Sequence, residues 1–575
     1  MMQRAAASPN RSAYIGLAAF SCFWMAALSG RFNLFVDIFY HAHWAKSFSE
    51  QFWSGEWYPR WLMALYDGMG DPVFFYYPPL AYWFTSLFHP LVALDSTYFL
   101  TLNTAALVAF FLSGVSCYHW LLRHVSLKSA FIGALMYLWF PSRIWFEYNF
   151  IYLYSQHLSY ILLPLIMMGI EDLLAGRKGG ILRYGICQGL LIMTNVPITI
   201  VFSGIPLLYA ALSTPWRRYP KLILPIATAL LIALGLSAMF WLPQQAYLSY
   251  INSSDIWNNP EQYPVHYAYS FISTGPYEAS QGILPKYSLA AFAILFTIYL
   301  IFTALLWKKR TPFIRCWWWV GLACFLMMLP LSKPIWDHVS VLQVAQRPWR
   351  FFVPVCLCLS LLIALWMEKK TPQSKSLLAV IGHALGKRVS LCFAVALTAF
   401  IYTQAAHPFF NTRDAELVLY FDTRTPPSPQ YMAKTIPYTE LYAGYYELDN
   451  KRLARFYRST PAVIAKGCAL SPNTLSQPQS RLITFEVQPH AKSCSLELRQ
   501  FYFPGWQAYA PKGALETKAN SKGLISISIP ASKTPTPVRL LLQAQPAERY
   551  GAMLSLTTIA LLVLCYLYAR RKAAV

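Results

Sequence analysis

The first residue suited to catalysis is an isolated acid near the N-terminus, Asp37. It follows the first apolar stretch of the chain and is surrounded by Phe35, Val36, Ile38 and Phe39. Apolar surroundings disfavour the charged form of a carboxyl group, so an acid placed there needs a compensating partner or a chemical role. Such a carboxylate can accept a proton as a general base, or it can stabilise the N-terminus of a helix. The sequence alone leaves both interpretations open.

Turn-forming and aromatic residues fill the segment after Asp37. The motifs are G-E-W-Y-P-R-W at 55–61, G-M-G-D at 68–71 and F-Y-Y-P-P-L-A-Y-W at 75–83. Aromatic faces suit sugar rings, and a guanidinium group suits a phosphate or carboxylate. An aromatic belt at the membrane interface explains many of the rings, but not the paired Pro and Gly residues. The substrate-binding candidates in this segment are His41, Arg60, Asp71, Tyr77 and Tyr82, with a turn cap as the alternative for Asp71.

Arg347 and Arg350 are the candidates for binding an anion. They are three residues apart at the start of an apolar stretch, a spacing that predicts one shared side if the segment is helical. Positive residues usually lie on the cytoplasmic side of a membrane. Two arginines on the external side are an exception to this rule, and the exception favours phosphate binding over anchoring to headgroups. Gln156 and His157 are further candidates in an external loop. Neighbouring polar residues expected to be mostly solvated are His43, Glu56, Asp67 and Glu147.

The composition indicates that these residues are positioned by a polytopic membrane protein. Hydrophobic residues make up 56% of the 575 residues and charged residues only 12%. Apolar stretches predict about 12 spans, at 13–30, 97–121, 129–146, 158–175, 183–196, 198–213, 221–242, 287–307, 315–331, 349–367, 389–405 and 550–569. The net charge of +23 comes from clusters in alternate loops, a pattern that reports topology and excludes a nucleic-acid-binding protein. Both termini are expected in the cytoplasm.

Three parts are expected along the chain. Residues 1–405 form the transmembrane part, with an external loop at 31–96 that contains interfacial helices at 41–53 and 79–91. Residues 406–547 are polar and contain strands of alternating polarity, which predicts an external β-sandwich. Residues 548–575 form a last span and a basic tail. Cys468 and Cys494 lie in the polar part and form a disulfide only if they are close in space.

These motifs resemble the first loop of GT-C-type membrane glycosyltransferases. The order is a first span, an external acid, then Y-P-R-W, G-x-G and F-Y-Y-P-P-L-x-Y. The closest resemblance is to the bacterial family labelled "6-pyruvoyl-tetrahydropterin synthase-related membrane protein" and to YfhO-like proteins. Q-R-P-W-R-F at 346–351 and F-P-G-W-Q-A-Y at 503–509 are similar to later motifs of that family. The chain departs from it at 154–157, where relatives often have an acidic residue.

The resemblance implies an inner-membrane enzyme with its active site on the periplasmic side. It would move a sugar from a polyprenyl-phosphate-linked donor to a cell-surface glycan, lipid or protein, with Asp37 as the general base. The motifs require no cofactor. They leave open whether a divalent cation takes part in the reaction. The absence of a P-loop, a dinucleotide fingerprint and an H-E-x-x-H motif argues against an ATP-driven pump and a soluble-type hydrolase. A flippase for lipid-linked saccharides and a non-catalytic assembly factor remain as alternatives.

Overall fold

The computed structural model describes residues 11–28, 37–94, 98–150, 152–251, 284–345, 347–368 and 463–574. The expected span at 389–405, Gln346 and the part of the β segment before 463 lie outside these residues. The chain divides into two compact units. The first contains Met1–Ile38, Asn103–Gly235 and Pro264–Glu416, and the second contains Phe39–Leu102, Leu236–Tyr263 and Leu417–Val575. Each unit is described by itself.

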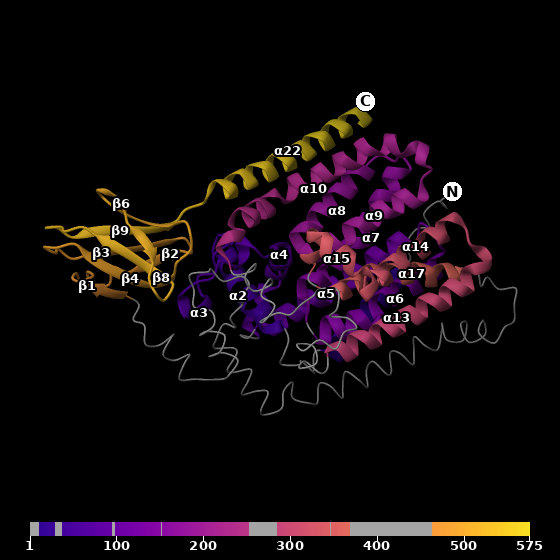
Figure 1. The fold of residues 1–575 in the computed structure, drawn as a ribbon, viewed down its shortest axis with the longest axis horizontal. Helices are drawn as coiled ribbons and strands as arrows, with labels where there is room; N and C mark the ends of the chain where they lie inside the picture. Colours follow the sequence, from indigo (N-terminus) through magenta and orange to yellow (C-terminus); the bar gives the residue numbers. More distant parts are fainter. Residues whose placement is uncertain are drawn as a thin grey trace. The chain divides into compact units, whose positions relative to one another are not determined.

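Helices make up most of the described residues (Figure 1), and many of them are apolar. Seven are long and apolar enough to cross a membrane, or eight if the bent pair Pro312–Leu326 and Pro330–His338 counts as one span. Three shorter apolar helices coincide with other expected spans. The expected helical membrane fold with a C-terminal β domain is therefore confirmed. Three differences account for the gap to about 12 spans: the three short helices, the bent pair, and the expected span at 389–405, which lies outside the described residues.

The first unit is a helical bundle. Its helices are α1 (Arg11–Leu28), α6 (Leu127–Trp139), α7 (Tyr154–Leu174), α8 (Gly180–Thr194), α9 (Val196–Ser213), α13 (Leu284–Leu306), α14 (Pro312–Leu326), α15 (Lys333–His338), α16 (Ser340–Gln343) and α17 (Phe352–Glu368). A π-helical segment, η3 (Ser142–Phe150), joins α6 to α7, and the 3₁₀ helix η8 (Pro348–Phe351) precedes α17. Helices α5 (Phe99–Leu121) and α10 (Tyr219–Tyr247) run from one unit into the other.

Small and capping residues shape this bundle. A Cβ on Gly169 of α7 would lie 2.6 Å from the backbone nitrogen of Tyr184, so only glycine lets α7 and α8 approach so closely. Helix α8 ends at Thr194, and the next helix begins after Asn195. The Asn195 side-chain oxygen accepts a bond from the Ile198 backbone nitrogen at 2.9 Å. This cap explains the break that the sequence places around Asn195 and Pro197.

The second unit begins with the first external loop. Helix α2 spans Ile38–Trp53, three residues longer than the predicted amphipathic helix. It is followed by α3 (Leu65–Gly68), η1 (Val73–Phe75), α4 (Leu80–Ser86) and η2 (His89–Ala93). The helix expected at 79–91 is thus divided between α4 and η2. Pro79 caps α4, and Pro90 lies in the first turn of η2.

Nine strands of the described residues form the β domain of the second unit (Figure 1). One antiparallel sheet has the order β1 (Val463–Lys466), β4 (Cys494–Phe501), β8 (Leu524–Ile529), β7 (Thr517–Ala519). The other has the order β2 (Ser476–Gln479), β3 (Leu482–Val487), β9 (Thr536–Leu542), β5 (Trp506–Ala510), β6 (Gly513–Leu515). Alternate residues are buried along β3, β4, β8 and β9, as the period-two pattern predicts. The last helix, α22, spans Pro546–Ala574.

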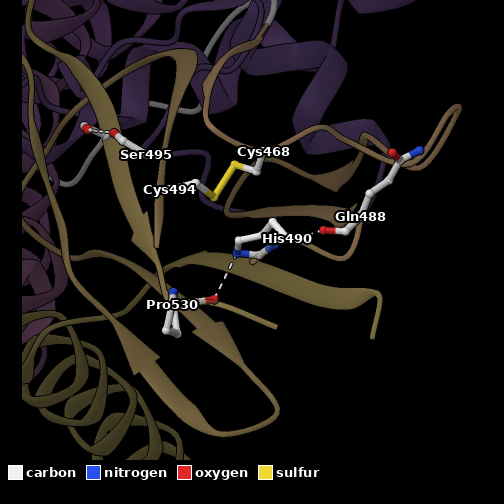
Figure 2. Close-up of a disulfide and its surroundings, with 7 residues drawn as sticks. Cys468, Gln488, His490, Cys494, Ser495 and Pro530 are labelled. Carbon is white, nitrogen blue, oxygen red and sulfur yellow. Dashed lines mark hydrogen bonds between the residues drawn. A yellow bond between two sulfur atoms is a disulfide. The ribbon is translucent and has the colours of Figure 1, made fainter. Parts of the chain in front are cut away.

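A disulfide joins Cys468 to Cys494, with the Cα atoms 5.7 Å apart (Figure 2). It ties the segment after β1 to the first residue of β4. Nearby, the His490 ring lies 2.9 Å from the carbonyl oxygen of Gln488 and 3.0 Å from that of Pro530. The two cysteines are therefore close enough to bond, which the sequence could not decide.

Candidate functional site

Asp37 lies in the turn immediately before α2. Its carboxyl group is half-buried, and burial raises its pKa to about 6. The positive charge of Arg350 acts in the opposite direction and lowers the pKa, but by less than burial raises it. A group with such a pKa is mostly ionised at neutral pH and can still accept a proton. These properties suit a general base.

Arg350 belongs to η8 and is only 7% exposed. Its Nη1 donates a hydrogen bond of 2.7 Å to the side-chain oxygen of Gln156, in the first turn of α7. The guanidinium carbon lies 5.3 Å from the centre of the Trp349 ring. Arg350 is thus held in one orientation by a neutral amide and an aromatic plane.

Arg347 does not share a helical side with Arg350, so that prediction is wrong. Its backbone is extended, with φ −140° and ψ 126°, and η8 begins only at Pro348. The cause is Pro348, because a proline ring disfavours helical backbone in the residue before it. Arg347 is half-buried at the start of η8.

Glu147 is a buried acid of the first unit that lies close to the same groups. It comes from η3, and its Oε2 accepts a hydrogen bond of 2.9 Å from the Tyr160 hydroxyl. Burial raises its pKa to about 7, while Gln156, Tyr160 and the charges of Arg143 and Arg350 act to lower it. We call Asp37, Glu147, Gln156 and Arg350 the Asp37 cluster. The sequence analysis treated Glu147 as one of several solvated loop residues, although its aromatic neighbours signalled burial.

His157 is buried beside this cluster, one residue after Gln156. Its ring is stacked between Phe110, with centroids 5.6 Å apart, and Tyr148, with centroids 4.9 Å apart. Neither ring nitrogen has a hydrogen-bond partner among the described residues. The stacking gives His157 a packing role and leaves two ring nitrogens for a ligand or water.

The candidates of the first external loop lie in the second unit, and three of them form one aromatic group. His41 Nδ1 lies 2.6 Å from the Tyr82 hydroxyl, and the Tyr77 ring packs edge-on against the His41 ring at 6.1 Å. Burial lowers the pKa of His41 to about 3, so the imidazole is neutral. A neutral imidazole can position a hydroxyl group but cannot neutralise a phosphate.

Arg60 is bonded within the protein. Its Nε lies 3.3 Å from Glu548 Oε2, and its Nη2 donates to the Met239 carbonyl oxygen at 2.6 Å. Arg481 Nη2 binds the same Glu548 oxygen at 2.9 Å, and the Tyr247 hydroxyl donates to Oε1 at 3.2 Å. We call Arg60, Tyr247, Arg481 and Glu548 the Glu548 clamp. It joins the first external loop, α10, the β domain and α22.

Asp71 is 1% exposed in a turn that packs against the β domain. Its backbone pairs with that of Leu62 through hydrogen bonds of 2.9 Å and 3.1 Å. Burial raises the pKa of its carboxyl group to about 7. Gly70 has φ +82°, and a Cβ there would lie 2.4 Å from the Trp61 ring, so the motif requires glycine.

The described residues contain no group of three or more His, Cys, Asp or Glu side chains arranged to hold a metal ion. The structure brings Asp37, Gln156 and Arg350 together in the first unit, with Glu147 added. It brings His41, Tyr77 and Tyr82 together in the second. The cluster of the first unit pairs a proton acceptor with a cation.

Comparisons with known proteins give no family. No family model matches the chain, and no curated protein matches it. The chain is similar to the crystal structure of ArnT from Cupriavidus metallidurans bound to undecaprenyl phosphate, with a TM-score of 0.42, 14% identity, and coverage of 77% of this chain and 72% of ArnT. For ArnT in the apo state the TM-score is 0.39, with 14% identity and coverage of 78% and 72%. These values are too low to transfer any residue's role.

Proposed function

We propose that this protein is a GT-C-type membrane glycosyltransferase. It moves a sugar from a polyprenyl-phosphate-linked donor to an extracytoplasmic acceptor. The observation that carries the proposal is the electrostatic coupling of Asp37 and Arg350, two residues far apart in the sequence, next to the buried acid Glu147. The motifs of the first external loop support the same reaction class.

In this mechanism Asp37 accepts the proton of the acceptor hydroxyl as its oxygen attacks the anomeric carbon. The bond between that carbon and the phosphate oxygen breaks, and its electron pair leaves with the polyprenyl phosphate. Arg350 stabilises the negative charge that develops there. A single displacement inverts the anomeric configuration. A base placed in this way contributes about 10²–10⁴-fold to the rate.

Gln156 and Glu147 act on Arg350 as positioning residues. Gln156 accepts a hydrogen bond from the guanidinium group, and the charge of that group lowers the pKa of the nearby Glu147 carboxyl. Arg347, half-buried beside Pro348, is a second cation for the same phosphate. Arg60 is given no role in this scheme, because its Nε and Nη2 are bonded within the Glu548 clamp.

The site is proposed to face the periplasm of a bacterial inner membrane. A disulfide in the β domain supports this orientation, since disulfides persist in oxidising compartments and are rare in the cytoplasm. Thiol labelling of intact cells with a membrane-impermeant maleimide, before and after reduction, tests it. Labelling of Cys468 and Cys494 only after reduction is expected, and a failure of both cysteines to label after reduction would contradict the periplasmic orientation.

The function is tested by mass spectrometry of surface glycans, lipids and polyprenyl-phosphate sugars. Cells that carry Asp37→Asn should lack one sugar on an envelope acceptor and accumulate the lipid-linked donor. Cells with the wild-type protein serve as the reference. Normal surface glycans in the Asp37→Asn strain, together with a defect when the gene is deleted, would favour a flippase or an assembly factor instead.

A further inference from the structure

The β domain carries a hollow of about 310 Å³. Its walls come from β5, β6 and β7, from the segment before β5 and from the segment between β9 and α22. This volume is at the lower end of the range for small-molecule sites. The polar and aromatic residues that line it are Tyr502, Trp506, Gln507, Tyr509, Thr517, Gln543 and Gln545.

Strand alternation and one glycine create this hollow. Along β5, Trp506 and Ala508 are buried, so Gln507 and Tyr509 face outward between them. Gly505 precedes them with φ +118°. A Cβ on Gly505 would lie 3.1 Å from Gln545 Nε2 and 3.3 Å from the Gln543 carbonyl oxygen, which would crowd the wall of the hollow.

The chemistry of the lining suits a neutral saccharide. The side chain of Gln543 donates a hydrogen bond to the Tyr509 hydroxyl, which orients both groups. Amides and hydroxyls donate and accept hydrogen bonds, as sugar hydroxyls do, and tyrosine rings offer a flat face for a pyranose ring. None of the described residues that line the hollow is Asp, Glu, Lys or Arg. An anionic ligand would find no countercharge there.

The hollow lies at the end of membrane-spanning helices. Gln545 directly precedes α22, whose first part is apolar enough to span a membrane. Tyr250, at the end of the candidate span Trp216–Tyr250, packs against Phe503, the residue after Tyr502, with ring centroids 6.5 Å apart. A ligand in the hollow therefore lies beside the ends of two candidate membrane spans.

We propose that this hollow binds an uncharged sugar of the acceptor glycan and presents that glycan at the membrane surface. This inference rests on the proposed glycosyltransferase function and adds to it the class and charge of the acceptor.

Saturation-transfer NMR on the full-length protein in lipid nanodiscs tests the inference. The probes are maltotriose, mannotriose and N,N′,N″-triacetylchitotriose. At least one is expected to show saturation transfer, reduced at least fivefold by Tyr509→Ala and by Gln545→Ala. Arg539→Ala is the matched control, because Arg539 is exposed opposite Tyr509 in the β5–β9 register but outside the hollow. Thermal unfolding of each variant verifies that it is folded.

Two outcomes overturn the inference. One is the absence of saturation transfer from every probe. The other is binding that survives both variants of the hollow or is lost in Arg539→Ala. The Asp37→Asn protein should bind the trisaccharide as the wild type does. Binding without an effect of Asp37→Asn on transfer would refute the enzyme alone, whereas loss of transfer in Asp37→Asn without any binding would refute the hollow alone.

Discussion

Both units contain buried arginine side chains near carboxyl groups, but the two units differ in how the positive charge of the arginine is compensated. In the Glu548 clamp, two guanidinium groups and a tyrosine hydroxyl converge on a single carboxylate. In the Asp37 cluster, Arg350 donates to the neutral amide of Gln156, and two acids keep raised pKa values despite its charge. The residues of the clamp therefore compensate one another's charges and hold neighbouring segments together. The cluster retains the capacity to take up a proton and to attract an anion.

The strongest test of this contrast is Asp37→Asn. We expect transfer activity to fall by about 10²–10⁴-fold, because the amide cannot accept the proton of the acceptor. Folding raises the carboxyl pKa from 3.8 to about 6, so the charged Asp37 costs stability as the pH rises through that range, and the cost is fully present at pH 8. The variant should therefore melt no lower than the wild type at pH 8. Glu50→Gln, at an exposed position of α2, is the control and should keep full activity.

The converse test is Glu548→Gln in the clamp. Removing the carboxylate leaves Arg60 and Arg481 without the charge that compensates them, at a cost of about 3 kcal/mol. Thermal unfolding should show a large loss of stability. Lys466→Gln, which removes an exposed ion pair with Glu497, should change little. Equal melting temperatures for Glu548→Gln and the wild type would remove the distinction between the two clusters.

The pH dependence of transfer is the third test. Below about pH 6 the rate should fall about tenfold per pH unit, because the protonated Asp37 carboxyl cannot act as a base. Initial rates at saturating donor between pH 4.5 and 8 measure this. A flat profile across that range would exclude Asp37 as the base.

The smallest expected effect is a shift of that midpoint in Arg350→Gln. Arg350 lowers the pKa of Asp37, so its removal should move the midpoint to higher pH, by less than burial raises it. Arg60→Gln should leave the midpoint where it is. A shift toward lower pH in Arg350→Gln would contradict the arrangement of charges described here.

The fold was largely predictable because its signals are periodic. Apolar stretches predicted the helices, and alternation along 482–487 and 524–529 predicted β3 and β8. Asp37 could be selected from the sequence because an acid among aromatic residues is conspicuous.

Pairings across the chain could not be predicted in the same way. Nothing near Arg60 in the sequence points to Glu548, which follows it by nearly the whole length of the chain. The effect of Pro348 on Arg347 was predictable from local sterics, yet the helical spacing suggested the opposite. Glu147 was overlooked because its partner Tyr160 lies on another helix.

The clamp also bears on how the β domain can move. Glu548 lies in the first turn of α22 and Arg481 directly before β3, and they are bonded to each other and to the first loop. A swing of the strands about this junction would have to break buried ion pairs. The two sheets and α22 are therefore expected to move together as one rigid body, so that a displacement of the sheets also tilts the helix.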